Sequence, residues 1–450
     1  MMAEQMMQNK AGEMAAKQTI PAGYKQTEVG IIPNDWGVKC LGELVEISSG
    51  ESPSKFTFNL SGIPYFKVEQ LNNGLVYAES TPYFIDSRKK ITSGSLIFPK
   101  RGASILLNKI RVLKYDSYMD TNLMTLTCSS ELNEFYLYNQ LIYKELSSVA
   151  DTTSIPQINN KHIVPYTIPY PAKAEQIAIA TVLSDSDALI VGLEQLIAKK
   201  QAIKTAAMQQ LLTGRTRLPA FALRPDGTPK GYKSSELGQI PEDWAVAAVS
   251  DVLSEISMGP FGSDIKVSNF VKSGVPVLNG INVSASKLVD SFSNFVTHEK
   301  AKELNKAVAS RGDVVVTHRG TIGQISYIPD DSLFDRYVIS QSQFRARFNN
   351  QVLPVWVVLF FLSPAGSARL LEGKGHTGVP AIAQATTTFR KLKFSLPSLE
   401  EQTAIATILS DMDSELTALE QKLAKARDVK QGMMQQLLTG RIRLPLPKEA

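Results

Sequence analysis

The chain has 450 residues, a length typical of about two to four domains. With 43% hydrophobic and 20% charged residues it has the composition of a globular protein, and its net charge of +5 permits nucleic-acid binding without requiring it. Cys40 and Cys128 are its only cysteines and it has four histidines, which excludes a disulfide framework and leaves little for a zinc site. We therefore expect a reducing, cytoplasmic location and no metal site.

Residues 1–22 show no basic segment followed by an apolar core, so they do not resemble a signal peptide. This Met- and Gln-rich stretch is predicted to be an N-terminal extension that is either a frayed helix or disordered. The motif Gly23–Trp36 opens a module in which short strands and one helix are expected. The strands are Ile63–Val68, Ser95–Phe98 and Leu123–Thr127, and the helical pattern lies near Leu132–Leu146. Short strands broken by Gly, Pro and Asn indicate an α+β module.

A long helix is predicted to follow this module. Its segment Glu175–Pro219 returns as Glu401–Pro445 at a constant offset of 226 residues (401 minus 175), with roughly six positions in ten identical. Gly214 and Gly440 stand where a glycine would end each helix. About 38 helical residues would span roughly 57 Å. Ser398, three residues before Glu401, is placed to form a capping box in the second copy.

The Pro- and Gly-rich stretch Leu218–Gly231 is predicted to be a linker, after which the opening motif returns as Gly231–Trp244. Shorter matches then follow in the same order, so the second half is expected to be the same unit. Its predicted strands are Val275–Leu278, Asp313–Thr317 and Gln343–Phe348, with a helical pattern near Val352–Leu371. The apolar run Val352–Leu362 is too short to span a bilayer and is predicted to be a buried helix.

Apolar residues recur every three or four positions along both long helices, which is typical of a coiled coil. Ser186, Lys200 and Lys204 interrupt the first row and Lys430 interrupts the second. Two unrelated helices packed on their own modules are the plainer interpretation, but pairing is favoured because each helix would otherwise expose the same seam. The residues predicted to pair the helices are Ile179, Leu183, Ile190, Leu193, Ile197, Leu211, Ile405, Leu409, Leu416, Leu419, Leu423 and Leu437.

The predicted fold is α+β, with two homologous α+β modules separated by two long antiparallel coiled-coil helices and related by a pseudo-two-fold internal repeat. Two similar modules held apart in this way suit a ligand with two separated sites, such as duplex DNA. The predicted boundaries are 1–22 for the extension, 23–172 for the first module, 173–214 for the central helix, 215–230 for the linker, 231–397 for the second module, 398–440 for the C-terminal helix and 441–450 for the tail.

Motifs for catalysis are missing from the sequence, which has no phosphate-binding loop with Gly-Lys-Ser/Thr, no His-Glu-x-x-His and no Gly-x-Ser-x-Gly. Gly373, Gly375 and Gly378 match G-x-G-x-x-G, but a probable helix precedes them and Pro380 follows, which does not fit a dinucleotide site. A flexible loop is the plainer interpretation, in which Lys374 and His376 would be able to reach a phosphate.

Several polar residues are candidates for contacts with DNA. Lys100 and Arg101 follow a predicted strand, and His318 and Arg319 take the same place in the second copy, where a guanidinium can be presented to a groove. A turn with a solvated charge is the alternative. A polar run contains Gln157, Asn159, Asn160, Lys161 and His162, and its counterpart contains Gln384, Thr386, Thr387 and Arg390. The alternative is that these residues cap the following strand. Lys67, Gln70, Asn72 and Asn73 are weaker candidates.

Basic residues on the long helices have a plainer account. A solvated helix face explains Lys199, Lys200, Lys204, Lys422, Lys425 and Lys430. The paired Gly-Arg-x-Arg-Leu-Pro ends are more distinctive, because they repeat in both copies. Their arginines, predicted to line a DNA backbone or to contact a partner subunit, are Arg215, Arg217, Arg441 and Arg443.

This set of motifs resembles the DNA-specificity subunit of type I restriction–modification systems. The resemblance covers about Gly23 to Pro445. It rests on the Pro-x-Asp-Trp motifs at 33–36 and 241–244, the turns at 155–156 and 379–380, Glu-Gln at 175–176 and 401–402, and Gln-Gln-Leu-Leu-Thr-Gly-Arg at 209–215 and 435–441.

The resemblance implies a non-catalytic subunit with two target recognition domains, each reading one half of a bipartite DNA site. The helices would set the spacer and dock two methyltransferase subunits that methylate adenine N6, and motor–nuclease subunits would complete the complex. No cofactor is expected in this chain, since S-adenosylmethionine, ATP and Mg would belong to those partners. A coiled-coil scaffold that presents two partner-binding domains without DNA is the alternative, and an enzyme is a third possibility that would need a motif not found here.

Overall fold

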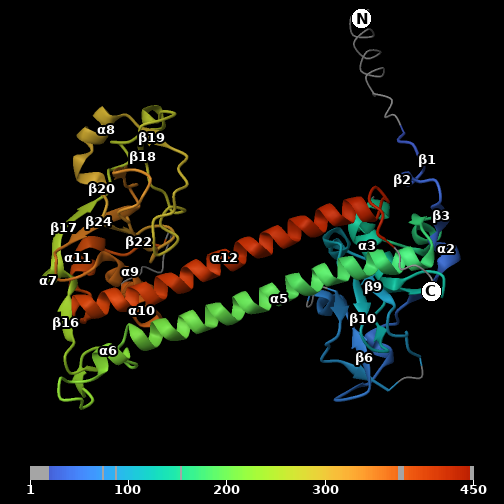
Figure 1. The fold of residues 1–450 in the computed structure, drawn as a ribbon, viewed down its shortest axis with the longest axis horizontal. Coiled ribbons are helices and arrows are strands. Elements are labelled where there is room, and N and C mark those ends of the chain that lie inside the picture. Colours follow the sequence, from blue (N-terminus) through green and yellow to red (C-terminus); the bar gives the residue numbers. More distant parts are fainter. Residues whose placement is uncertain (1–19, 73–75, 87–88, 153–154, 373–379, 446–450) are drawn as a thin grey trace, which may run out of the picture. The chain divides into compact units, whose positions relative to one another are not determined.

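The computed structural model describes residues 20–72, 76–86, 89–152, 155–372 and 380–445. Most of the predicted N-terminal extension therefore lies outside the described residues. The chain forms two compact units, of which unit 1 comprises Met1–Gln195 with Glu420–Ala450 and unit 2 comprises Leu196–Leu419. The boundaries fall inside both long helices, α5 (Lys173–Leu211) and α12 (Leu399–Leu437), so each helix contributes one part to each unit (Figure 1).

Unit 1 contains a five-stranded sheet with the order β4-β12-β9-β10-β7 and a four-stranded sheet with the order β11-β6-β8-β5. The hairpin β1-β2 and the antiparallel pair β3-β13 complete its strands. The strands are β1 Tyr24–Thr27, β2 Gly30–Pro33, β3 Gly37–Cys40, β4 Val45–Ser49, β5 Phe58–Asn59, β6 Ile63–Phe66, β7 Tyr77–Ala78, β8 Phe84–Ile85, β9 Leu96–Pro99, β10 Arg111–Leu113, β11 Tyr118–Met119, β12 Leu123–Cys128 and β13 Thr167–Tyr170. Within the described part of unit 1, the α-helices besides α5 and α12 are α2 Leu41–Leu44, α3 Glu134–Lys144 and α4 Asn160–Ile163.

Unit 2 contains a four-stranded sheet with the order β17-β24-β21-β22 and several two-stranded pairs. The strands are β14 Tyr232–Ser235, β15 Gly238–Pro241, β16 Ala245–Ala248, β17 Leu253–Met258, β18 Val275–Pro276, β19 Phe295–Val296, β20 Val308–Ser310, β21 Val314–Thr317, β22 Ile325–Tyr327, β23 Arg336–Val338, β24 Gln343–Phe348 and β25 Lys393–Leu396. The shorter helices are α6 Pro219–Ala222, α7 Val249–Val252, α8 His298–Glu303, α9 Pro354–Leu362, α10 Pro364–Leu370 and α11 Ala385–Lys391.

The internal repeat predicted from the sequence is confirmed down to strand register. The order β4-β12-β9-β10 in unit 1 matches β17-β24-β21-β22 in unit 2. Thr125 lies opposite Ser48 on one neighbour and Ile97 on the other. Arg345 takes the same place opposite Ser257 and Val315. Residues of the two units can therefore be compared position by position.

The predicted strands are confirmed with small shifts at their ends, but the helical pattern near Val352–Leu371 forms two helices. α9 ends before Ser363, and α10 begins at Pro364. Ser363 Oγ accepts a hydrogen bond from Gly366 N at 3.2 Å, which caps the second helix. Proline at the first helical position fits this new start, because its missing N–H would have no partner there.

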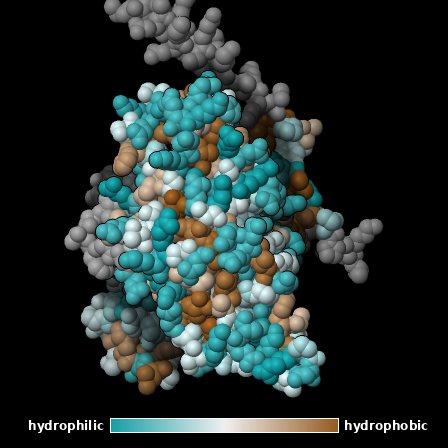
Figure 2. All heavy atoms as spheres, turned by 90° about the vertical axis from the view of Figure 1, so that its left-hand side faces the viewer, coloured by the Kyte–Doolittle hydropathy of each residue, from teal (hydrophilic) through white to brown (hydrophobic). Residues whose placement is uncertain are grey.

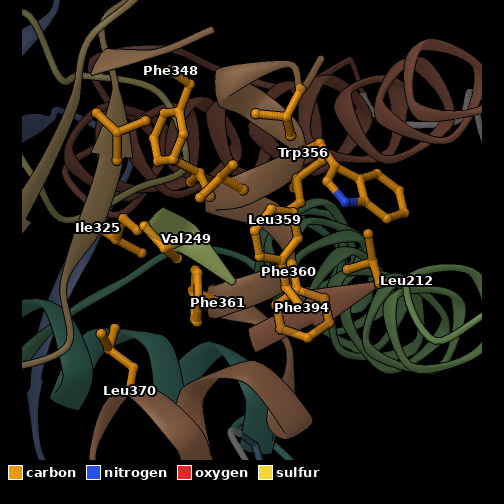
Figure 3. Close-up of a cluster of buried hydrophobic side chains, with 14 of the residues drawn as sticks. Leu212, Val249, Ile325, Phe348, Trp356, Leu359, Phe360, Phe361, Leu370 and Phe394 are labelled. Atoms are coloured by element: carbon orange, nitrogen blue, oxygen red, sulfur yellow. The ribbon is translucent and has the colours of Figure 1, made fainter. Parts of the chain in front are cut away.

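The core of unit 2 is centred on α9, whose residues Trp356–Phe361 are all buried. Figure 3 shows Trp356 above Leu212, with Phe360, Phe361 and Phe394 gathered to the left of Leu212. The indole N–H of Trp356 donates to the Ser395 carbonyl at 2.9 Å, so the polar atom of this large side chain is satisfied. Because Leu212 directly follows α5, the end of that helix is part of this core.

The long helices pair in antiparallel order within each unit. In unit 1, Asp187 pairs with Lys430 at 2.6 Å and Glu194 pairs with Arg427. In unit 2, Lys200 pairs with Glu415 at 2.7 Å and Lys204 pairs with Asp413. The lysines that interrupt the apolar rows thus lie on the pairing side and have acidic partners on the opposite helix. A purely solvated face is the wrong interpretation for Lys200, Lys204 and Lys430.

The residues named for helix pairing occupy two environments. Those near the helix ends lie in the module cores: Ile179, Leu183 and Leu437 in unit 1, and Leu211, Ile405 and Leu409 in unit 2. Ile190, Leu416 and Leu419 are also buried, while Leu193, Ile197 and Leu423 are half-buried. The helices therefore do more than pack on their own modules, because the last turn of α5 is built into unit 2 and the last turn of α12 into unit 1.

A four-residue ion-pair cluster, which we call the clamp, fixes the helix ends in unit 2. Arg217 donates to both oxygens of Glu401 at 2.8 and 2.9 Å, and its Nη1 donates to Asp243 at 2.7 Å. Trp244 Nε1 donates to the same Glu401 carboxylate at 2.8 Å. Burial raises the pKa of Asp243, but hydrogen bonds from Arg217 and Lys230 outweigh it and bring that pKa to about 2.

The equivalent clamp in unit 1 joins Asp35, Trp36, Glu175 and Arg443. Trp36 Nε1 donates to Glu175 Oε2 at 3.0 Å, and Arg443 Nη2 donates to the same oxygen at 2.8 Å. Arg443 also donates to both oxygens of Asp35 at 2.9 Å. The prediction that Arg217 lines DNA or contacts a partner is therefore wrong, because Glu401 and Asp243 hold its buried side chain. Arg443 is also ion-paired, but like Arg215 and Arg441 it is exposed, so the prediction stays open for these three residues.

Two other sequence features lie next to the clamps, the glycine that ends each long helix and the predicted capping box. Gly440 has φ +70°, and a Cβ there would lie 2.5 Å from Pro33, so only glycine permits this approach. Ser398 Oγ accepts a hydrogen bond from Glu401 N at 3.4 Å, but the Glu401 carboxylate binds Trp244 and Arg217 instead of reaching back. The predicted capping box is therefore only half formed.

Among the described residues, α5 is long and apolar enough by length and composition to cross a membrane. Its buried Glu175 and Gln176 and its ion-paired lysines Lys200 and Lys204 indicate instead that it packs against protein.

Figure 2 shows the face that carries β16, β17 and α7, where hydrophilic side chains surround a narrow band of hydrophobic atoms.

Candidate nucleic-acid interface

The basic loop of unit 1 follows β9, and that of unit 2 follows β21. Lys100 and Arg101 lie directly after β9, and His318 and Arg319 lie directly after β21. The glycine that follows each pair has positive φ, which turns the chain away from the sheet. The side chains of Arg101 and Arg319 are exposed and form no hydrogen bond or ion pair within the part of the chain that the structure describes.

Backbone hydrogen bonds join each basic loop to the segment at the start of the polar run in unit 1 and to the segment just before the polar run in unit 2. In unit 1, Gly102 N donates to the Pro156 carbonyl and Ile158 N donates to the Lys100 carbonyl, both at 2.9 Å. Arg101 therefore lies opposite Gln157. In unit 2 the residues that follow the same pattern, at the same 2.9 Å distances, are Gly320 with Pro380 and Ile382 with His318.

The two inner residues of the basic loops are partly shielded from solvent. Burial lowers the pKa of Lys100, with Arg101 adding to the effect, and Lys100 Nζ donates to Ser49 Oγ at 2.8 Å. Burial also lowers the pKa of His318, and Nε2 of this ring is buried without a hydrogen-bond partner among the described residues. The outward positive charge of each loop is therefore carried by Arg101 and Arg319.

Residues of the polar runs divide into capping and exposed positions. Asn159 N–H donates to His162 Nδ1 at 3.1 Å, and Asn159 caps α4, so the capping interpretation holds for this pair. The side chains of Asn160 and Lys161 are exposed, while Gln157 is half-buried. In unit 2, Gln384 has φ +45° just before α11, and Gln384 and Arg390 are exposed.

Three remaining candidates lie apart from these groups. Lys67 follows β6 on the four-stranded sheet, with its Nζ 3.5 Å from the centre of the Tyr83 ring. This cation–π contact gives the lysine a local role, on a different sheet from Lys100. Lys374 and His376 lie outside the described residues, as does the G-x-G-x-x-G pattern around them.

Sequence reasoning missed one polar group in unit 2, on the strand predicted at Gln343–Phe348. Arg345 and Arg347 alternate with Phe344 and Ala346, so both point to the face opposite the central core. Arg347 Nε donates to the fully buried Asp313 at 2.7 Å. Charged residues at alternate positions of an otherwise apolar strand were the available signal.

Comparison with known proteins agrees with this geometry. A sequence model described as the type I restriction modification DNA specificity domain matches residues 33–205 and again residues 241–426. The chain is 26% identical to the type I restriction enzyme MjaVIII specificity subunit of Methanocaldococcus jannaschii, over 92% of this chain and 94% of that protein. It is 25% identical to the putative type I restriction enzyme MjaX specificity subunit of the same organism, over 94% and 97%.

A similar fold occurs in the crystal structure of the type I restriction–modification S subunit from M. genitalium. The TM-score is 0.55 at 15% sequence identity, and the match covers 92% of this chain and 97% of that one. The family match covers most of the chain and occurs once in each module. The chain therefore belongs to the family of type I restriction–modification DNA-specificity subunits, which are non-catalytic components with two recognition domains.

Proposed function

We propose that each module reads one half of a bipartite DNA site through its basic loop and the polar run bonded to it. The observation that carries this proposal is the recurrence of one exposed arginine, Arg101 or Arg319, at the same place in both modules. An exposed guanidinium without an internal partner is free to bind phosphate or the edge of a guanine. The neighbouring side chains differ between the modules, which supports two different half-sites.

The long helices would set the unread gap and dock two methyltransferase subunits. Each helix has 39 residues, or about 58 Å at 1.5 Å per residue. Because the end of each helix is clamped into a module core, its length would be transmitted to the spacing of the half-sites. Binding of the first half-site would raise the effective concentration of the second module at its own half-site.

The complete assembly would include motor–nuclease subunits and would act in the cytoplasm. S-adenosylmethionine would be held by the methyltransferase subunits, and ATP and Mg by the motor–nuclease subunits. Adenine N6 methylation would follow from placing the methyltransferase at the sequence that this chain selects. No cofactor is assigned to a residue of this chain.

The test is co-expression with the methyltransferase encoded beside this chain, followed by single-molecule sequencing of adenine methylation in host DNA. We expect two short blocks separated by a fixed degenerate gap. Arg101→Gln should relax or abolish recognition of one block and Arg319→Gln should affect the other, so each variant serves as a control for its counterpart. If an assembled complex supplied with cofactor leaves DNA unmethylated and unbound, the scaffold alternative gains support.

A further inference from the structure

Unit 2 contains a cationic cavity of ≈ 490 Å³ between β20, β23, β24 and α8. Arg345 and Arg347 line it from the sheet, and Lys302 and Arg336 line it from the facing elements. No aspartate or glutamate is among its described lining residues. Four positive side chains around one open space produce a potential that attracts anions.

The cations of this cavity fall into two classes. Arg347 is neutralised by Asp313, and Arg345 binds the Glu255 carboxylate at 2.5 Å. Lys302 and Arg336 are exposed and make no side-chain hydrogen bond or ion pair with any described residue. Lys302 lies near the Glu299 carboxylate without forming an ion pair with it, so two positive charges without a bonded partner line the cavity.

Arg345 provides a second, independent observation. Its side chain is 5% exposed, yet its Nη1 atom has no hydrogen-bond partner among the described residues. Oδ2 of Asp313 lies 3.7 Å from this Nη1 atom. A buried donor left unsatisfied is unfavourable, and a negative charge in the cavity that Arg345 lines would stabilise its guanidinium.

The internal repeat shows that this charge set is specific to unit 2. Ser95, Thr125 and Thr127 occupy in unit 1 the places of Asp313, Arg345 and Arg347. Ser95 and Thr127 hydrogen-bond to each other at 2.8 Å, so an uncharged pair satisfies the same position. The fold therefore does not require these charges.

We propose that this cavity binds a phosphate group, and that in the assembled complex this group is a backbone phosphate of the half-site read by unit 2. The second part rests on the proposed function. Arg347 lines the cavity and binds Asp313, which directly precedes β21, while the basic loop follows the other end of this strand. The four residues of β21 separate the two by about 13 Å at 3.3 Å per residue. About four base pairs of duplex cover that distance, since each strand carries one phosphate per 3.4 Å.

The test uses the assembled methyltransferase complex and the double variant Lys302→Gln/Arg336→Gln. Both side chains are exposed and unpaired, so stability should not change. Binding to a target duplex and to a scrambled duplex should weaken by the same factor, and the slope of log K against log salt should become shallower by about 0.9, because the cavity holds one phosphate. The control Lys272→Gln/Lys287→Gln removes the same charge from exposed positions that do not line the cavity, and should leave the slope unchanged.

A second variant transplants the residues of unit 1: Asp313→Ser, Arg345→Thr and Arg347→Thr. It should reduce binding in the same sequence-independent way without leaving a buried acid unpaired. Titration of the full chain with inorganic phosphate separates the two sources of a phosphate group. If DNA binding is unchanged but phosphate binds the wild type and not the variants, the cavity is a site for a free phosphate compound.

Unchanged DNA and phosphate binding in both variants would overturn the inference, as would an equal loss in the control pair. Failure of the wild-type complex to bind its target would instead count against the proposed function. The two failures are therefore distinguishable.

Discussion

The clamp of unit 2 predicts a large and specific loss of stability on removal of Arg217. The side chains of Arg217 and Glu401 are 7% and 2% exposed, so Arg217→Met leaves a buried carboxylate with Trp244 as its remaining clamp partner. Breaking a buried ion pair from one side costs about 3–5 kcal/mol, and we expect unit 2 to lose stability in this range at neutral pH. Methionine keeps most of the aliphatic packing, so the loss should reflect the charge.

The measurement is chemical denaturation followed by tryptophan fluorescence. Trp244 lies against the guanidinium of Arg217, with 5.6 Å between Cζ and the ring centre, and reports on the clamp directly. Glu401→Gln removes the charge from the other side, and the double variant should cost less than the sum of the single variants by about 1–3 kcal/mol. Arg443→Met is the matched variant in unit 1, and because Arg443 is 39% exposed its cost should be smaller, about 1–3 kcal/mol.

Additive effects of the two substitutions, or a loss below about 1 kcal/mol for Arg217→Met, would refute this reasoning. Such a result would mean that water reaches Glu401 and replaces the arginine. An equal loss in both units would show that exposure of the arginine does not control the strength of the clamp.

Three further predictions concern acid stability, the helix end and the spacing of the half-sites. The pKa of Asp243 is lowered to about 2 in the folded state. Its contribution to the free energy of unfolding is therefore complete above the ordinary carboxyl pKa and is lost as pH falls through about 2. Asp243→Asn should cost about 1–2 kcal/mol at pH 7, after allowance for partial exposure, and nothing once acid titration passes below about pH 2. Gly440→Ala should destabilise unit 1 by at least about 1 kcal/mol in thermal unfolding, because φ is +70° and Cβ would meet Pro33; unchanged stability would mean that the turn relaxes freely. The third variant has seven residues inserted after Leu193 and seven after Arg427, two points that lie opposite each other next to the Glu194–Arg427 pair. The methylation gap should lengthen by about three base pairs while the half-sites stay the same. An unchanged gap would contradict the spacer role.

The sequence alone determined the duplicated architecture, the α+β modules and the long helices. These features depend on patterns that recur along the chain, such as the 226-residue offset (401 minus 175) and the apolar rows, and such patterns are visible without coordinates. The positions of the basic loops were predictable for the same reason, since Arg101 and Arg319 follow recognisable strands.

Only the tertiary structure decided which charged residues pair with each other. Arg443 meets Asp35 and Glu175 across separations of 408 and 268 residues, and no local pattern reports a contact of that kind. Lys204 and Lys430 interrupt the apolar rows in sequence, yet each lies beside an acid on the other helix. Burial and charge pairing depend on which segments meet in space, so the roles of these residues, and the cavity lined by Arg345, followed from the fold.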